Sequence, residues 1–477
     1  MKAKFSEYLS SIAPGIKQLI AELGKSYDYV SVLSTDSVGF SMTASQRVKS
    51  ISAKTLMVER GNVVRVYKDG LYSEYSFNLF DSENVAEKAG KIKEVLDKQL
   101  AVLKATQTEV YNTEKLTDEP QELFVEMETT DLPEEADLDA LIRRFKEISD
   151  KGAALSEEII DCNVRGESTH VSKMFLTTNK DLRQSYVQST GSVVMFGSRN
   201  GKTDNGYQAI SDREGPAIFD GLEDLIDKSY RELNDCLGAE HVVPGEYDVV
   251  TSPEVSGLIA HEAFGHGVEM DMFVKNRALG QEYIDKRVGS DLVSMHEGAL
   301  VCKDTSSYAF DDEGTPAGDV LEIDKGILKT GVCDALAALR LGTKPTGNGK
   351  RENFEHKVYT RMTNTMFDSG NSTKEEMIAS IKKGYLLEGF NSGMEDPKHW
   401  GIQCIISRGY EIIDGKLTGK VVAPLVLTGY VPDLLNSISM ASTDYESFGS
   451  GMCGKGHKEW VKTADGGPYL KCRVRLG

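Results

Sequence analysis

Apolar residues recur at close to a 3.6-residue period over residues 5–23, which predicts an amphipathic helix at the N-terminus. Three segments of alternating polarity follow, rich in Val, Ser, Tyr and Thr and punctuated by Gly61-Asn62 and Asp69-Gly70 turns. They predict strands over 27–42, 49–58 and 62–78. A helical period returns over 84–103. The first hundred residues therefore predict a small layer of helices on a sheet.

The pattern changes twice before the middle of the chain. Residues 106–137 hold the main concentration of acidic side chains together with two prolines, and we interpret them as a solvated linker. Beyond them a helix over 138–155, a strand meander over 157–210 and a helix over 222–237 are expected. A turn-forming segment near 238–245 marks the boundary between two domains, 1–240 and 241–477, as the length of 477 residues favours.

The second half begins with a short strand over 247–250 and a helix that starts at Ser252, with Pro253 at its first position. A further helix is expected over 375–383. Residues 401–427 alternate like paired strands around an Asp414-Gly415 turn, and the chain ends in a strand over 469–476.

Charge and composition narrow the class of protein. Lys and Arg total 55 against 74 Asp and Glu, and the net charge of -19 repels nucleic-acid phosphates, so no direct nucleic-acid partner is expected. The N-terminus is too polar for a signal peptide, and no segment approaches 18 apolar residues, so we expect a cytoplasmic protein without a membrane partner. Seven scattered cysteines suit a reducing compartment.

The helix that starts at Ser252 carries His261-Glu262-Ala263-Phe264-Gly265-His266, a pattern one residue longer than the metallopeptidase motif H-E-x-x-H. Positions i and i+4 lie about 40° apart around a helix, whereas i and i+5 lie roughly 140° apart. A regular helix therefore cannot direct both imidazoles at one ion. We predict a π-type bulge, which Gly265 makes less costly.

Two imidazoles suit zinc, and a catalytic zinc site needs a third protein ligand and an open position for water. Glu262 would be the general base for that water and so must not bind the metal itself. By its setting in a glycine-rich loop, Cys453 is the best candidate for the third ligand. Its competitors are His457, Glu269 and Asp271, and spacing does not decide among them.

These residues resemble the TldD/PmbA family of metallopeptidases, in particular its TldD-type, metal-bearing members. Blocks that match in the family's order are HEAFGHGVEMD (261–271), DDEGTP (311–316), GNGKR (347–351), RMTNT (361–365), EEMI (375–378) and MCGK (452–455). The resemblance spans most of the chain and is strongest after residue 247. It departs at DPKHWGIQC (396–404) and at the charged segment 456–468, which puts the substrate preference in doubt.

The resemblance implies an α+β protein, with an α/β layered N-terminal domain and a β-rich C-terminal domain that carries the metal-site helix. It implies that Zn²⁺ is bound by His261, His266 and Cys453, with Glu262 as the catalytic carboxylate. It also implies a homodimer, or a heterodimer with a related subunit, that cleaves unfolded or unstructured peptides entering as extended strands. The alternative function is a regulatory binding protein of the gyrase-modulator type, whose role needs no hydrolysis.

Two polar residues of the 361–365 block are candidates for substrate binding. Arg361 and Asn364 could line the cleft and form hydrogen bonds with the backbone of an extended peptide.

Overall fold

The predicted N-terminal helix is present in the computed structural model, which describes residues 1–55, 58–106, 112–456 and 458–477. Helix α1 (Glu7–Leu23) begins where the Ser6 hydroxyl accepts a hydrogen bond from the Leu9 amide, a side-chain N-cap. The buried side chains of α1 keep the spacing seen in the sequence, and they include Leu9, Ile16 and Leu23.

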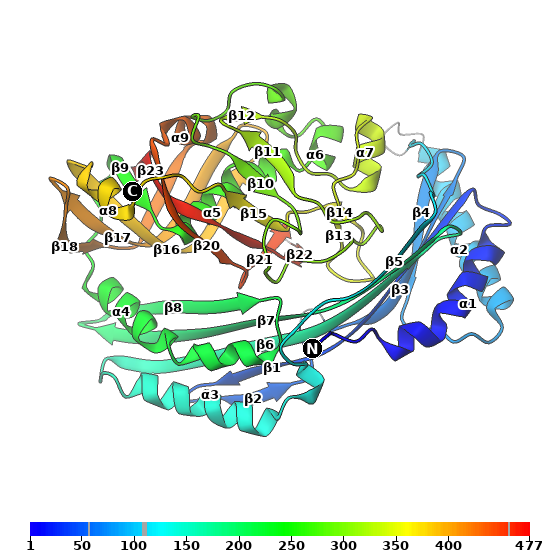
Figure 1. Cartoon of the computed structure of the whole chain (residues 1–477), viewed down its shortest axis with the longest axis horizontal. Helices are drawn as coiled ribbons and strands as arrows, with labels where there is room; N and C mark the ends of the chain where they lie inside the picture. Colours follow the sequence, from blue (N-terminus) through cyan, green and yellow to red (C-terminus); the bar gives the residue numbers. More distant parts are fainter. Residues whose placement is uncertain (56–57, 107–111, 457) are drawn as a thin grey trace.

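Most of the first half of the chain builds one sheet, which has eight strands among the described residues. Its strands are β1 (Tyr29–Ala44), β2 (Lys49–Ser52), β3 (Arg60–Lys68), β4 (Leu71–Phe77), β5 (Gln121–Glu126), β6 (Ile159–Leu176), β7 (Lys180–Arg199) and β8 (Lys202–Asp212). The main path runs β4-β3-β1-β6-β7-β5, with β2 beside β1 and β8 beside β7. Figure 1 shows how long β1, β6 and β7 are relative to their neighbours.

Four helices cover one face of this sheet. They are α1, α2 (Val85–Thr106), α3 (Leu138–Ala153) and α4 (Leu225–Gly238). Alternate residues of β1 explain the layering, because side chains two apart share a face. Val32 packs in the core under α1 and α2, Met42 packs in the core under α3 and α4, and Leu33, on the opposite face, packs with Phe310 of the second half.

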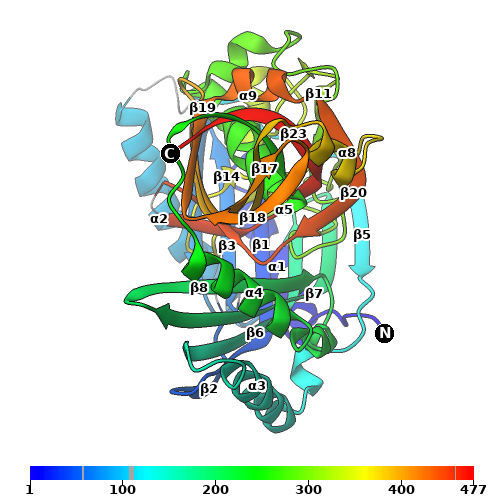
Figure 2. The ribbon, with the colours of Figure 1, turned by 90° about the vertical axis from the view of Figure 1, so that its left-hand side faces the viewer.

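The second half builds an 11-stranded sheet among the described residues. Its strands are β9 (Gly245–Thr251), β10 (Met295–Glu297), β11 (Val320–Asp324), β12 (Ile327–Leu328), β15 (Asn364–Phe367), β16 (Lys383–Asp396), β17 (Gly401–Ile413), β18 (Lys416–Val422), β19 (Leu425–Tyr430), β20 (Met440–Phe448) and β23 (Ala464–Leu476). Because β23 pairs with both β19 and β9, the path β9-β16-β17-β19-β23 closes on itself. Helix α5 (Pro253–Ala260) packs against this closed ring of strands. Figure 2 gives a view into the ring.

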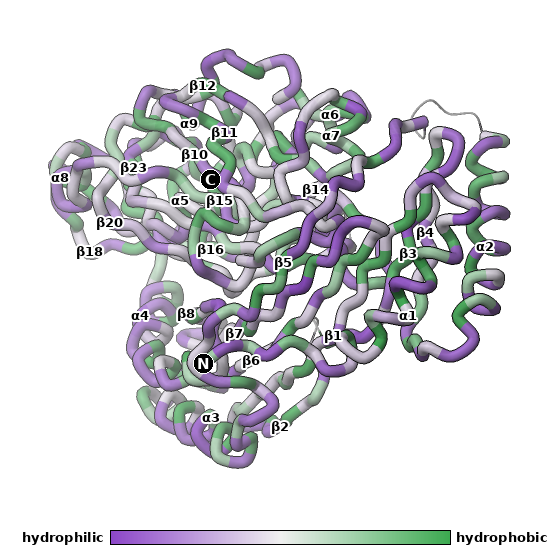
Figure 3. The backbone as a smooth tube through the Cα atoms, turned by 45° about the vertical axis from the view of Figure 1, so that its right-hand side comes forward, coloured by the Kyte–Doolittle hydropathy of each residue, from purple (hydrophilic) through white to green (hydrophobic). Residues whose placement is uncertain are grey.

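Short elements complete the second half. They are α6 (Asp271–Val274), α7 (Ala335–Leu341), α8 (Lys374–Ala379), α9 (Val431–Ser437), the two-residue pair β13 (Gly349–Lys350) and β14 (Tyr359–Thr360), and the hairpin β21 (Met452–Lys455) and β22 (Lys458–Lys462). Figure 3 shows hydrophilic segments on the outside of both halves.

The two halves meet through buried ion pairs formed by the DDEGTP and GNGKR blocks. Arg65 of β3 pairs with Glu313, and Arg351 pairs with Glu74 of β4 at 2.6 Å. Between the two blocks, the Asp311 carboxylate accepts a hydrogen bond from the Gly349 amide at 2.8 Å. These blocks therefore fix the second half on the first sheet and contain none of the predicted metal ligands.

The structure confirms the predicted α+β fold class: helices and sheets are mixed, and the C-terminal half is rich in strands. The division at residue 240 stays a prediction, although the strands change from the first sheet to the second between Asp212 and Gly245.

The acidic stretch differs from the linker that the sequence predicts. Residues 107–111 lie outside the described residues, but β5 pairs in parallel with β7, because Leu123 and its neighbours have strand character. Among the described residues no helix is long and apolar enough to cross a membrane.

Candidate metal centre

The helix that carries the two histidines changes its winding where they lie. The Ser252 hydroxyl accepts the Val255 amide and caps α5. After Ala260 the chain continues as a π-helical turn, His261–Gly265, and then as a 3-10 turn, His266–Val268. The predicted bulge is confirmed. A Cβ atom at Gly265 would lie 2.1 Å from the Met362 Sδ atom, so the turn packs too closely for a larger residue.

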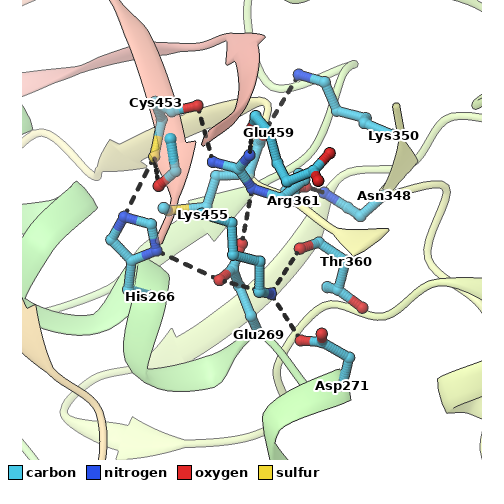
Figure 4. A network of polar contacts seen from close by, with 12 residues as sticks. His266, Glu269, Asp271, Asn348, Lys350, Thr360, Arg361, Cys453, Lys455 and Glu459 are labelled. Carbon is cyan, nitrogen blue, oxygen red and sulfur yellow. Dashed lines mark hydrogen bonds and ion pairs between the residues drawn. The ribbon is translucent and has the colours of Figure 1, made fainter. Parts of the chain in front are cut away.

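This winding brings His261 and His266 together with a cysteine from far along the chain. The two imidazole rings lie 5.2 Å apart between centroids, with their planes at 86°. The His266 Nε2 atom lies 3.2 Å from the Cys453 Sγ atom (Figure 4). The three candidate ligand atoms all lie within 4.8 Å of one another, which is close enough to bind one ion.

Cys453 is held on the β21–β22 hairpin, where it pairs with Val461. Only 8% of the residue is exposed. Its carbonyl oxygen accepts a hydrogen bond from the Arg361 guanidinium at 3.0 Å, so the backbone that carries the thiol is fixed as well. The hairpin therefore presents a buried sulfur to the turn that carries both histidines.

The His261, His266 and Cys453 side chains shift each other's pKa values. Burial raises the pKa of Cys453, but the neighbouring His266 and His261 outweigh it and lower that pKa well below the usual value. Burial lowers the pKa of His266, yet the Cys453 thiolate raises it well above the usual value. By the same opposing effects, the pKa of His261 rises to about 9. The thiolate and the imidazoles thus stabilise each other's charged forms.

The chemistry of this site fits a zinc ion. Two imidazoles and a thiolate are ligands that zinc prefers. The Nδ1 atom of His261 is buried and has no hydrogen-bond partner among the described residues. Such an atom costs free energy, and an ion bound to the ring would explain it. The centre also opens on a cavity, which leaves room for a water molecule and a substrate.

Glu262 follows His261 directly but does not belong to the group of candidate ligands. Its carboxylate lines the same cavity and lies against β16. A Cβ atom at Gly393 of that strand would lie 2.3 Å from Glu262 Cγ and 2.9 Å from Glu262 Oε1. Strand β16 therefore defines the position of the carboxylate beside the two imidazoles.

The cavity has a volume of about 920 Å³ and receives residues from both halves of the chain. Asn205 and Tyr207 come from β8 of the first sheet, and the Tyr207 hydroxyl lies 3.4 Å from the Ser450 hydroxyl oxygen beside the cysteine hairpin. Its other walls include α5, the histidine turn, β16, the loop before β21, the hairpin itself and the start of β23. A chamber of this size accommodates several residues of a peptide.

The second half of the chain matches a known family model. Residues 244–473 match the PmbA/TldA metallopeptidase C-terminal domain, a range that holds both histidines, Glu262 and Cys453. Relatives that include TldD homologues align with the chain, and a solved TldE structure has the same fold. The chain belongs to the TldD/PmbA family.

Relatives of this TldD/PmbA chain carry metalloprotease names. A metalloprotease of Methanocaldococcus jannaschii is 30% identical over 283 residues, which cover 58% of this chain and 62% of the relative. A metalloprotease of Synechocystis is 26% identical over 98% of both chains. A zinc metalloprotease TldD homologue of Saccharolobus solfataricus is 30% identical over 54% of this chain and 56% of the relative. The chain thus spans about three fifths of the length of the first archaeal relative.

Solved structures of the family share the whole fold. TldE from Thermococcus kodakarensis superposes with a TM-score of 0.78 at 16% identity, covering 97% of this chain and all of that one. A Thermotoga maritima protein described as a modulator of a DNA gyrase superposes with a TM-score of 0.77 at 18% identity. The superposition covers 98% of this chain and all of the Thermotoga chain. At such low identity these likenesses concern the fold alone.

The structure separates the candidates for the third ligand in this TldD/PmbA chain. Glu269 and Asp271 are not grouped with the histidines; both pair with Lys455, at 3.1 and 2.8 Å. Cys453 lies beside His266. The remaining candidate, His457, lies outside the described residues.

Arg361 and Asn364 are not where a substrate-binding role requires them. Both are completely buried, and neither lines the cavity. Asn364 donates to the Gly298 carbonyl oxygen at 3.1 Å, and Arg361 donates to the backbone of Cys453 and Glu459. The prediction that they bind substrate is therefore corrected: these polar side chains satisfy buried backbone groups and do not reach a peptide.

The sequence did not reveal the acidic character of the cavity wall. Glu254, Glu395 and Asp465 line it, and burial is the largest cause that raises the pKa of each, to about 8, 9 and 7. Both carboxylate oxygens of Glu395 are buried without a hydrogen-bond partner among the described residues. No spacing in the sequence connects these three residues, because the fold gathers them from α5, β16 and β23.

Proposed function

We propose that this chain is a TldD-type zinc metallopeptidase that hydrolyses unfolded or unstructured peptides. The observation that carries the proposal is the convergence of His261, His266 and Cys453 within 4.8 Å, beside Glu262 and at the wall of a cavity of about 920 Å³. The metalloprotease names of its relatives agree with this activity.

His261, His266 and Cys453 would hold the ion, and Glu262 would act on the water. A bound zinc ion supplies Lewis-acid chemistry, lowering the pKa of a water molecule and polarising a carbonyl group. Glu262 then accepts the proton of the attacking water and transfers it to the leaving amine. Its position against Gly393 keeps the carboxylate near the histidines, but Glu262 is not one of the three proposed ligands.

An extended substrate fits the free part of β16. Among the described strands, β16 pairs with β17 along its length but with β9 only over Gly384, Tyr385, Leu386 and Leu387. The following residues, which include Phe390 and Met394, line the cavity next to Glu262. A peptide can add to such an open edge through backbone hydrogen bonds, which recognise extended backbone with little dependence on side chains.

Metal analysis combined with peptide cleavage tests the proposal. The purified wild-type chain should contain zinc and cleave unfolded casein. Glu262→Gln should retain zinc and lower kcat by about 10²–10⁴-fold, because only the base is lost. Cys453→Ala and His266→Ala should lose both zinc and cleavage. His296→Ala is the matched control, since His296 pairs with Asp319 outside the cavity.

Two other results would contradict the peptidase function. A regulatory binding protein predicts that Glu262→Gln leaves the cellular role intact. A structural metal site predicts bound zinc without hydrolysis of any unfolded substrate by the wild type.

The proposal includes a dimer and a cytoplasmic location. The dimer contains two copies of this chain, or one copy and a related subunit. Mass measurement by light scattering, for the chain alone and after co-expression with a related chain of the same genome, distinguishes the two.

A further inference from the structure

Glu269, three residues beyond His266, lies where the histidine turn meets the cysteine hairpin. Its side chain is only 3% exposed. The carboxylate Oε2 atom lies 3.3 Å from His266 Nδ1, the ring nitrogen that does not face Cys453 (Figure 4). A carboxylate on Nδ1 fixes the proton there, so Nε2 is left with its lone pair toward Cys453 and the ion.

The same carboxylate is tied to the hairpin. Lys455, two residues after Cys453, contacts Glu269 Oε2 at 3.1 Å and Asp271 at 2.8 Å, and it donates to the Thr360 carbonyl oxygen at 3.0 Å. The Lys455 side chain is 16% exposed, so solvent screens these pairs little. Lys455 thereby fixes one end of the strand that carries the thiol.

Arg361 connects the remaining side. Its Nε atom lies 3.4 Å from Glu269 Oε1, while its terminal nitrogens donate to the Cys453 and Glu459 carbonyl oxygens. Glu269 is therefore in contact with one metal-binding side chain and with two cations that hold the backbone of another. Figure 4 shows these contacts as one continuous network.

We propose that Glu269 is a positioning residue for the metal centre: it orients His266 and, through Lys455 and Arg361, fixes the hairpin that presents Cys453. This inference rests on the proposed function, because it assumes an ion bound by His261, His266 and Cys453. It assigns Arg361, together with Lys455 of the MCGK block, a role in assembling ligands from distant parts of the chain.

Zinc affinity measured by competition with a chromophoric chelator tests the proposal. Glu269→Gln keeps the shape of the side chain and removes its charge, so zinc affinity should fall about 10–100-fold. In protein loaded with Co²⁺ in place of zinc, the thiolate-to-cobalt charge-transfer band of the wild type should weaken or shift in the variant. A role in stability alone would lower the melting temperature and leave the affinity and the band of the folded protein unchanged.

Glu297→Gln is the matched control. Glu297 is also a fully buried carboxylate of the second half, and it accepts hydrogen bonds from Thr363 and Thr365 but contacts none of the three proposed ligands. This variant should bind zinc like the wild type. If Glu269→Gln does not fold, Lys455→Met tests the same link and should also weaken zinc binding about tenfold.

Each outcome has one meaning. Wild-type affinity and an unchanged cobalt band in Glu269→Gln, or wild-type affinity in Lys455→Met, overturn the positioning role and leave the peptidase proposal standing. A wild-type chain that binds neither zinc nor cobalt overturns both.

Discussion

The Nε2 atom of His266 lies 3.2 Å from the Sγ atom of Cys453, although 187 positions separate the two residues in the sequence. The π-helical turn carries the imidazole, and the β21–β22 hairpin carries the thiol. Each of the two side chains is thus held by an ordered element of the fold, which limits the conformational entropy that they lose when they bind an ion.

Removal of zinc should make Cys453 the most reactive cysteine of the chain. The neighbouring histidines, despite burial, lower the pKa of Cys453, whereas burial raises the pKa of Cys302, the most exposed of the other cysteines, to about 12. After chelation, iodoacetamide should modify Cys453 about tenfold faster than Cys302 at pH 7. Mass spectrometry of the alkylated peptides measures both rates. Equal rates, or no protection by added zinc, would contradict the assignment of Cys453.

Gly393→Ala should separate catalysis from metal binding. The added methyl group would overlap Glu262 Cγ at 2.3 Å and displace the carboxylate, while His261 and His266 keep their positions. A displacement of about 1 Å costs on the order of 10²-fold in rate, so kcat should fall by that factor while zinc content remains at the wild-type level. Gly401→Ala on the neighbouring strand is the control, because nothing lies within 4 Å of its Cβ position. Unchanged kcat in Gly393→Ala would disprove this placement of the base.

The local parts of the centre could be predicted from the sequence because they follow from helix geometry. The five-residue spacing of His261 and His266 excludes a regular helix, and the π-helical turn provides the required rotation. The third ligand could not be chosen from spacing. Glu269, Asp271 and Cys453 all have suitable atoms, and only the fold shows that Lys455 pairs with both carboxylates while the thiol meets His266.

Other features depend on pairings between distant strands. The closed path of strands depends on β23 joining β9 and β19, and no periodicity within β23 indicates which strands flank it. Arg361 resembles a substrate-binding residue because it is polar and follows a short strand, yet the fold surrounds it with buried carbonyl oxygens. Residues 121–126 form a short strand whose pattern is obscured in the sequence by the charge excess of the acidic stretch around it.

Trp400→Ala should destabilise the second half strongly. Trp400 is completely buried and packs against Phe264 of the π-helical turn at 5.2 Å and against Tyr283 at 4.6 Å. Loss of the indole ring should lower the free energy of unfolding by about 3–5 kcal/mol, because both the transfer energy and the packing are lost. Urea unfolding followed by circular dichroism measures this change. Trp460→Ala is the control. Because Trp460 is 45% exposed, its replacement should lower the free energy of unfolding much less.

Glu59 should make the stability of the chain fall as the pH rises from about 4.5 to about 7. Burial raises the pKa of Glu59 from 4.5 to about 7, and its carboxylate accepts the Phe354 amide of the second half at 3.0 Å. Between these two pH values the folded chain keeps a proton that the unfolded chain has lost, so folding takes up a proton and rising pH opposes it. Below 4.5 both states are protonated, and above 7 neither is, so this contribution is constant outside the window.

Glu59→Gln removes the titration and keeps an oxygen that can accept the Phe354 amide. The variant should therefore gain stability relative to the wild type as the pH rises through this window, and the difference should level off above pH 7. Urea unfolding at half-unit pH steps measures the difference in the free energy of unfolding. Glu157→Gln, at an exposed position, is the control and should show no such trend. A difference between Glu59→Gln and wild type that does not depend on pH would show that Glu59 titrates alike in the folded and unfolded chain.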